Sequence, residues 1–313
     1  MTTQLPPSVT NNPDTRLDPS TIRYDDEMEL QGTTFLLDVW RAFRRNRLAM
    51  LGLGVVCFFI LVALFAPLLA PKDPYKVDMI KQFTPPGSEF LLGSDTYGRD
   101  VLSRIIYGSR ISLTIGVIPT LLSTTFGAVL GVIAGYFGGR VDSFIMRLAD
   151  MVMAFPSLLL SMVVMYTLGA SMYNLFIALS IVGWAGTSRI VRAQTLSYKE
   201  REFVEAARAA GVKTPIIMLR HIIPNCMPQL LIILTMGIPG AILSEASLSF
   251  LGVGAQPPMS SWGLMVSNGR EYLTMAPWNS IYPGVAILIT VLAFNFLGDG
   301  IRDALDPYLK NSR

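Results

Sequence analysis

Residues 48–70 read LAMLGLGVVCFFILVALFAPLLA and carry no charged side chain over 23 positions. A helix needs roughly 20 apolar residues to cross the hydrocarbon core of a bilayer, so this stretch predicts a transmembrane helix. The whole chain of 313 residues has the same bias: 51% of its residues are hydrophobic and only 15% are charged. Its mean hydropathy is +0.48, whereas soluble domains carry roughly 25% charged residues. The sequence therefore predicts an integral membrane protein.

Further charge-poor stretches predict an all-α fold with more spans of the same kind. Residues 151–188 carry no charge over 38 positions, but the polar sequence TLGAS at 167–171 interrupts them, which favours two spans joined by a tight hairpin. We expect six transmembrane helices, at residues 48–70, 111–137, 148–168, 172–190, 228–251 and 281–298. An even number of spans places both termini on one side of the membrane.

The distribution of basic residues predicts which side that is. Of the 25 Lys and Arg residues, 18 fall in the tails and loops on the side of the termini and seven on the other. Basic loops stay cytoplasmic, so both termini are expected to be cytoplasmic. The segments between the spans are then a polar tail at 1–35, a basic anchor against lipid at 36–47, an external segment at 71–110, a cytoplasmic loop at 193–227, an external loop at 252–280 and a cytoplasmic tail at 299–313.

Several kinds of function lack the residues they need. A net charge of +3, scattered along the chain, gives no nucleic-acid footprint. Cys57 and Cys226 lie far apart and His221 is the only histidine, so neither a metal site nor a nucleophile paired with a base is indicated. No intramembrane hydrolase arrangement of paired Asp or Ser and His is present in the spans, and no GxxxxGK[ST] loop occurs. We expect no cofactor and no nucleotide site in this chain.

Glu245 and two prolines are candidates for the lining of a translocation path. A carboxylate inside a span costs roughly 2.5–3.5 kcal/mol at its centre, so Glu245 is expected to face the bundle interior or a hydrated cavity. Pro156 and Pro239 interrupt spans, and such breaks occur beside water-filled paths as well as at plain packing kinks; the residues alone leave both open. Asp150 stands beside Arg147, which predicts a local ion pair.

The loop between the fourth and fifth spans has the most specific sequence. Good helix formers at 199–210 end at Gly211, which suits a helix C-terminus, and Pro215 suits the first turn of a second short helix. The alanines at 206, 207, 209 and 210 leave little side chain, so this helical elbow could enter a narrow groove on another protein, with Glu205 as its one directed charge. The alternative is an amphipathic loop that lies on the membrane.

These residues resemble the signature of the permease subunits of bacterial binding-protein-dependent ABC importers. The match comprises Glu205-Ala206-Ala207, Gly211 and Ile223-Pro224, while His221 departs from the aliphatic residue of many members. The resemblance implies a type I importer permease fold in the bacterial inner membrane and an elbow that docks on an ATPase subunit. The coupling residues it implies are Glu205, Ala206, Ala207, Gly211, Val212, Lys213, Thr214 and Pro224.

Two further stretches are similar to the dipeptide, oligopeptide and nickel permeases, specifically to the second, C-type subunit. They are LGSDTYGRD at 92–100 with its continuation to Leu113, and LSFLGVG at 248–254 with the following QPP and SWG; the ending at 298–307 agrees. This resemblance suggests contacts with a binding protein, or an external gate, at Asp95, Arg99, Asp100, Arg104, Arg110 and Trp262.

The partners implied by the resemblance are a second related permease, two cytoplasmic ATPase subunits that bind ATP and Mg, and an external substrate-binding protein. The expected cargo is a dipeptide or oligopeptide, with nickel or another small solute as the alternative. An ion-driven secondary transporter is a more distant alternative, because such proteins are built from internal repeats with charges at mid-membrane, whereas this chain has no convincing repeat and only Glu245 as a deep charge.

Overall fold

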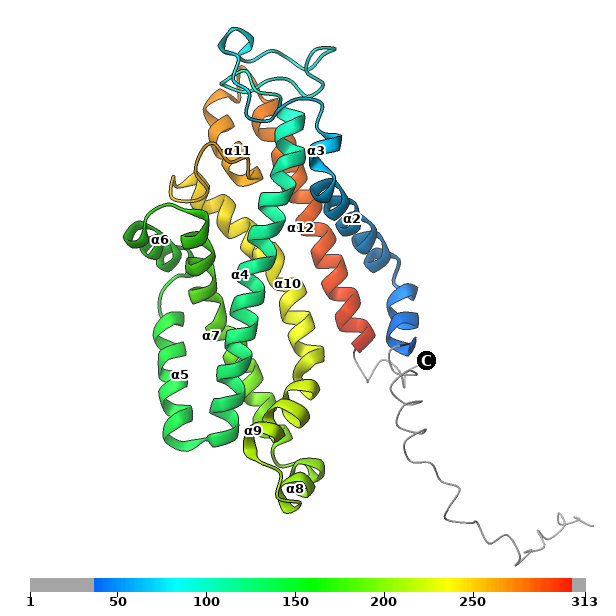
Figure 1. The fold of residues 1–313 in the computed structure, drawn as a ribbon, viewed down its shortest axis with the longest axis vertical. Coiled ribbons are helices and arrows are strands. Elements are labelled where there is room, and N and C mark those ends of the chain that lie inside the picture. Colours follow the sequence, from blue (N-terminus) through cyan, green and yellow to red (C-terminus); the bar gives the residue numbers. More distant parts are fainter. Residues whose placement is uncertain (1–36, 306–313) are drawn as a thin grey trace, which may run out of the picture.

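The computed structural model describes residues 37–305, and the regular secondary structure in that range is helical (Figure 1). The predicted tail at 1–35, Leu36 of the basic anchor and residues 306–313 lie outside the described residues. The helices are α2 (Arg47–Leu64), α3 (Ala66–Leu69), α4 (Val101–Phe137), α5 (Gly139–Met153), α6 (Ser157–Leu168), α7 (Met172–Tyr198), α8 (Glu202–Ala209), α9 (Thr214–Ile217), α10 (Ile223–Phe250), α11 (Trp262–Gly269) and α12 (Trp278–Leu305).

Five helical stretches of the described range are long and apolar enough to cross a membrane. They are α2, α4, α7, α12 and the run Thr214–Phe250, which contains α9 and α10. Helices α5 and α6 pass the same test only as a pair, and they meet at a bend of 90°. The described chain thus has five candidate spans, or six if the bent pair counts as one.

The bend between α5 and α6 divides the single span expected over 148–168 into two helices. Helix α5 ends at Met153 and α6 begins at Ser157, on either side of Pro156. A proline disfavours helical dihedrals at the residue before it, which explains why the helix stops there. Helix α5 also starts earlier than expected, at Gly139, and carries charges that face α7.

Two ion pairs hold α5 against α7. Asp142 pairs with Arg192, and Asp150 pairs with Arg189. The expected local pair of Asp150 with Arg147 is therefore wrong: the partner of Asp150 lies on the neighbouring helix, 39 residues further along the chain.

Helix α4 starts ten residues before the expected position at 111. Asp100 caps its first turn, with Oδ2 accepting hydrogen bonds from the backbone N–H of Ser103 at 2.8 Å and from the Ser103 hydroxyl at 2.6 Å. At 1.5 Å per residue α4 is about 55 Å long, well beyond the roughly 30 Å of a hydrocarbon core. Its ends must project from the membrane.

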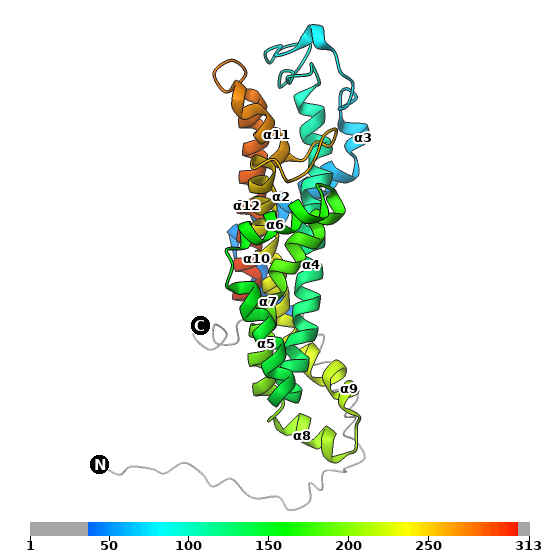
Figure 2. The ribbon, with the colours of Figure 1, turned by 90° about the vertical axis from the view of Figure 1, so that its left-hand side faces the viewer.

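The start of α2 and the end of α12 meet at one end of the bundle. Phe43, Ala49 and Ala304 pack together, and the Asn46 side-chain amide donates to Asp303 Oδ2 at 3.4 Å. The elbow formed by α8 and α9 projects from this same end (Figures 1 and 2). Residues 71–100, which we call the loop cap, and α11 lie at the opposite end (Figure 2).

Candidate functional site

The elbow begins with α8, and Gly211 ends it by a specific hydrogen-bond pattern. The N–H of Gly211 donates to the Arg208 carbonyl, and the N–H of Val212 donates to the Ala207 carbonyl, both at 3.1 Å. Gly211 has φ +74°, a left-handed conformation that glycine adopts without strain and that most other residues avoid. These features form the Schellman motif that ends many helices. The helix end expected at Gly211 is confirmed.

The second helix of the elbow, α9, continues through a π-turn into α10. Helix α9 begins at Thr214 with Pro215 in its first turn, as the sequence predicts. Residues 218–222 continue as one π-helical turn, and the chain enters α10 at Ile223 with Pro224 second. Single π-turns of this kind are frequent at functional sites.

One face of the elbow is buried and the other is open. Val204 and Ala207 face the bundle, whereas Glu205 and Ala206 are exposed. A Cβ added at Gly211 would meet no atom within 4 Å, so the space beside the Schellman turn is empty. Among the other residues expected to couple, Lys213 and Pro224 are exposed, and Val212 and Thr214 are half-buried.

The buried face of the elbow shares one apolar cluster with three long helices. Tyr198 at the end of α7 also donates its hydroxyl to the Asn225 carbonyl of α10, at 3.2 Å. The cluster comprises Val204 and Ala207 of α8, Ile217 of α9, Ile222 of the π-turn, Cys226 and Leu230 of α10, Ala128 and Val132 of α4, and Val191 of α7. The elbow is therefore packed directly against α4, α7 and α10, and packed interiors of this kind resist compression.

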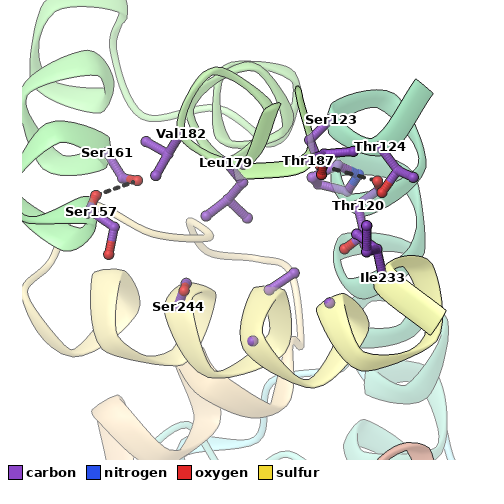
Figure 3. A pocket seen from close by; sticks show the side chains of 15 residues that line it. Thr120, Ser123, Thr124, Ser157, Ser161, Leu179, Val182, Thr187, Ile233 and Ser244 are labelled. Carbon is purple, nitrogen blue, oxygen red and sulfur yellow. Dashed lines mark hydrogen bonds between the residues drawn. The ribbon is translucent and has the colours of Figure 1, made fainter. Parts of the chain in front are cut away.

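The same three helices, together with α6, line a cavity of about 220 Å³ (Figure 3). The lining is hydroxyl-bearing, small or aliphatic, and includes no charged side chain. It comprises Pro119, Thr120, Ser123 and Thr124 of α4, Ser157 and Ser161 of α6, Leu179, Val182, Gly183 and Thr187 of α7, and Ile233, Gly237, Gly240, Ala241 and Ser244 of α10.

Several of the cavity hydroxyls donate to their own helix. Thr120 Oγ1 donates to the Gly116 carbonyl at 2.6 Å, Ser123 Oγ to the Thr120 carbonyl at 3.0 Å, and Ser161 Oγ to the Ser157 carbonyl at 2.9 Å. A hydroxyl that donates in this way keeps its acceptor lone pairs free. The cavity therefore offers neutral hydrogen-bonding groups to a solute without fixing a charge.

The three residues expected to line the path lie beside the cavity or away from it. Pro156 precedes Ser157 and creates the bend that turns α6 across the bundle, so it positions lining residues without being one. Pro239 is buried in α10 between Gly237 and Gly240, whose backbones do line the cavity.

Glu245 is buried between α10 and α11 and does not line the cavity. Its Oε1 accepts hydrogen bonds from Ser249 Oγ at 2.7 Å and from Ser261 Oγ at 2.8 Å. Ser261 is also the N-cap of α11, with its hydroxyl accepting from the Leu264 N–H. Glu245 thus ties α11 to α10, and its neighbour Ser244 is the side chain that reaches the cavity.

Four of the five charged residues expected at an external gate or a binding-protein contact meet at the loop cap and are buried: Asp95, Arg99, Asp100 and Arg104. Arg110, the fifth, is exposed and lies further along α4. Asp95 Oδ2 accepts from Arg99 Nε at 2.7 Å and lies 3.5 Å from Arg104 Nε. Arg104 also donates to the carbonyls of Pro74 and Met259. With Asp100 capping α4, these groups stabilise the cap from within.

Trp262, the uncharged residue expected at an external gate or a binding-protein contact, packs in the core. Trp262 is fully buried: its indole N–H donates to the Ile105 carbonyl at 3.0 Å and its ring packs on Phe59.

On the surface of the loop cap, a hydrogen bond between Lys81 and Glu89 raises the pKa of Lys81 and lowers the pKa of Glu89. Exposed pairs of this kind contribute little stability.

The hydroxyl residues of the cavity were not among the residues expected to line a path, although the sequence carries a signal for them. Thr120, Ser123 and Thr124 recur at helical spacing in an apolar span, as do Ser157 and Ser161. Such spacing places the polar groups on one face. The spacing thus identifies a polar face on α4 and on α6. Only the structure shows that these two faces meet α7 and α10 around one cavity.

Together these features define a class of protein: a polytopic helical membrane protein with a neutral cavity between its helices and an exposed helical elbow at one end. Residues 127–311 match the family described as binding-protein-dependent transport system inner membrane component. Residues 34–86 match the N-terminal TM domain of oligopeptide transport permease C. The chain belongs to this family of inner membrane transport components, and is a multi-pass protein of the bacterial inner membrane.

Characterised relatives cover nearly the whole chain. It is 41% identical to the dipeptide transport system permease protein DppC of Alkalihalophilus pseudofirmus, over 88% of this chain and 90% of that protein. It is 39% identical to the oligopeptide transport system permease protein OppC of Bacillus subtilis, over 96% of this chain and 99% of that one. DppC of Haemophilus influenzae is 42% identical, over 91% and 99%.

A solved structure has the same fold. A chain of the inward-facing MetNI methionine ABC transporter superposes with a TM-score of 0.53 at 16% identity, covering 66% of this chain and 97% of that chain. At this identity the likeness concerns the fold alone, and it confirms the expected importer permease architecture.

Proposed function

We propose that this chain is the C-type permease subunit of an ATP-driven importer that carries dipeptides or oligopeptides into the bacterial cytoplasm. Relatives at about 40% identity are named as dipeptide and oligopeptide permeases, which supports a peptide cargo. The neutral, hydroxyl-lined cavity supports it as well, because peptide amides are uncharged hydrogen-bonding groups common to every peptide.

The observation that carries the mechanism is the apolar cluster shared by the elbow and α4, α7 and α10. In the proposed complex two partner ATPases bind ATP and Mg and close on each other, displacing the exposed face of α8. The residues that receive this displacement are Glu205, Ala206, Ala207, Gly211, Val212, Lys213, Thr214 and Pro224. The shared cluster passes the motion to helices that line the cavity, which changes the side to which the cavity opens.

The proposed orientation places the elbow and both termini in the cytoplasm. Arg208, Lys213 and Arg220 lie in or next to the elbow, and Arg189 and Arg192 lie in the half of α7 that leads to it. Basic residues of this kind remain on the cytoplasmic side. The loop cap then faces an external binding protein, and a second, homologous permease completes the path.

Reconstitution tests this function. The chain is co-expressed with its genomic neighbours, placed in proteoliposomes with ATP inside, and supplied with binding protein and a radiolabelled tripeptide. We expect uptake that requires internal ATP and that survives a protonophore. Uptake driven by an ion gradient without ATP would indicate a secondary transporter, and uptake of ⁶³Ni²⁺ without peptide uptake would indicate the nickel alternative. Either result overturns the proposal.

A further inference from the structure

Arg110 of α4 completes an interrupted hydrogen-bond ladder at the end of α2. Pro67 has no N–H to donate to the Ala63 carbonyl, and the Leu68 N–H turns to the Phe65 carbonyl instead. The freed carbonyls of Ala63 and Leu64 accept from Arg110, through Nε and through Nη2 at 2.9 Å respectively. Within the described residues, no hydrogen bond or ion pair engages the third nitrogen, Nη1.

Arg110 stands at one end of an open apolar groove between α2 and α4. The groove has a volume of about 530 Å³, and Arg110 is the only charged side chain in its lining. The apolar walls include Ile60 and Leu64 of α2 and Val117 and Ile118 of α4, all of them exposed. The groove therefore combines a hydrocarbon-like wall with one exposed cation whose Nη1 has no partner among the described residues.

The position of Arg110 along α4 matches the level of lipid headgroups. Helix α4 exceeds a hydrocarbon core of roughly 30 Å by about 25 Å, so a centred helix projects about 13 Å at each end. Arg110 lies nine residues after Val101, which is about 14 Å along the axis. The guanidinium therefore lies near the boundary between hydrocarbon and headgroups. Tyr107, whose ring centroid is 5.8 Å from the guanidinium carbon, is typical of that boundary.

We propose that the α2–α4 groove is a phospholipid site, with a phosphate oxygen on Arg110 Nη1 and an acyl chain along the wall formed by Ile60, Val117 and Ile118. Arg110 then makes two kinds of contact. Its Nε and Nη2 donate to the last carbonyls of α2, and its Nη1 binds the headgroup by a charge-assisted hydrogen bond. Bound lipid would hold α2 to α4 at the level where α2 breaks. This site is independent of the nature of the cargo.

The test uses the intact importer in nanodiscs that contain a phosphatidylglycerol with a diazirine on its acyl chain. After illumination, we expect labelled peptides from α2 and α4 around the groove. Arg110→Gln keeps an amide donor but removes the charge, and should reduce this labelling about tenfold, the loss expected for one charge-assisted hydrogen bond. Arg110→Lys should retain part of the labelling.

A matched control and a second variant separate lipid binding from folding. Arg270 also donates to a helix-terminal carbonyl, that of Phe250, but it is not part of the α2–α4 groove, so Arg270→Gln should leave the labelling of that groove unchanged. Thr114→Trp fills the groove while keeping Arg110 and its cap, and should also reduce labelling. Unchanged labelling in both Arg110→Gln and Thr114→Trp overturns the proposal. So does crosslinking of a photoreactive residue at Val117 to the second permease, which would make the groove a subunit interface.

Discussion

Gly131 of α4 lies directly against the Ser188 carbonyl of α7, so close that a Cβ on the glycine would stand 2.6 Å from the oxygen. Gly127 and Gly135, one turn away on either side, face the carbonyls of Trp184 and Arg192 in the same way. The two backbones therefore touch along three turns. In lipid, where helices gain no hydrophobic energy from association, close packing of this kind stabilises the pair.

Replacing Gly131 by Ala should destabilise the protein. The added methyl group meets backbone atoms that cannot move aside, and overpacking of this kind costs about 1–3 kcal/mol. Gly186 on α7 is the matched control, because a Cβ there meets no atom within 4 Å and Ala is the better helix former by about 1 kcal/mol. Thermal unfolding of the purified complex in detergent should show a lower Tm for Gly131→Ala only. Equal Tm values for the two variants would contradict direct backbone contact.

Replacing Gly211 should separate ATP hydrolysis from uptake. Gly211→Val places a β-branched residue at φ +74°, which costs about 1–2 kcal/mol, and adds a side chain to the open face of the elbow. We expect normal membrane insertion, retained ATPase activity and at least tenfold lower uptake. Gly211→Asn is the control, because Asn tolerates this conformation, and it should keep most of the uptake. Wild-type uptake by Gly211→Val would refute a docking role for the Schellman turn.

Reversing the charge of Glu205 tests the docking face without changing the elbow backbone. Glu205 is exposed in the first turn of α8, where the interaction of a carboxylate with the helix dipole stabilises the helix by about 0.3–1 kcal/mol. Glu205→Lys should lower uptake strongly and leave the abundance of the protein in the membrane unchanged, whereas Glu205→Gln should have a smaller effect. The measurements are uptake and ATPase rates of the reconstituted complex. Equal uptake in wild type and Glu205→Lys would show that this charge contacts no partner.

Cysteine labelling distinguishes two neighbouring positions of α10. Ser244 lines the cavity, whereas Glu245 is 1% exposed and bonded to Ser249 and Ser261. A membrane-permeant maleimide should modify Ser244→Cys and fail to modify Glu245→Cys in the folded complex. Preferential labelling at 245 would restore the expectation that this carboxylate faces the path.

How far the sequence predicts this fold depends on the range of the interactions. The spans follow from charge-free runs, and the elbow follows from Gly211 and Pro215, because each of these signals acts within a few residues. The bend at Pro156 was only partly predictable: the proline is visible, but a charge-free run of 38 residues gives no sign that α5 extends back to Gly139.

Side-chain partners were the part that the sequence could not supply. Asp150 has Arg147 nearby in the chain, yet it pairs with Arg189 because α5 packs along α7. Glu245 needs a polar partner wherever it lies, and Ser261, 16 residues away, becomes that partner only because α11 folds back on α10. Arg110 was expected at an external gate or a binding-protein contact, and nothing in the sequence indicated that two of its nitrogens cap carbonyls that Pro67 leaves free.

Thr187 allows the polarity of the cavity to be tested directly. Its side chain lines the cavity from α7, and Val has nearly the same shape without the hydroxyl. Losing one neutral hydrogen bond from this hydroxyl to the transported peptide costs about 0.5–1.5 kcal/mol, so Thr187→Val should slow peptide uptake about two- to tenfold. Stimulation of the ATPases by binding protein should persist, because the elbow and its apolar cluster are untouched. Thr167→Val is the matched control: this hydroxyl is exposed near the end of α6, donates to the Val163 and Val164 carbonyls of its own helix and does not line the cavity. If both variants reduce uptake equally, the cavity is not the path, and the solute must cross along a surface that this chain shares with its partner.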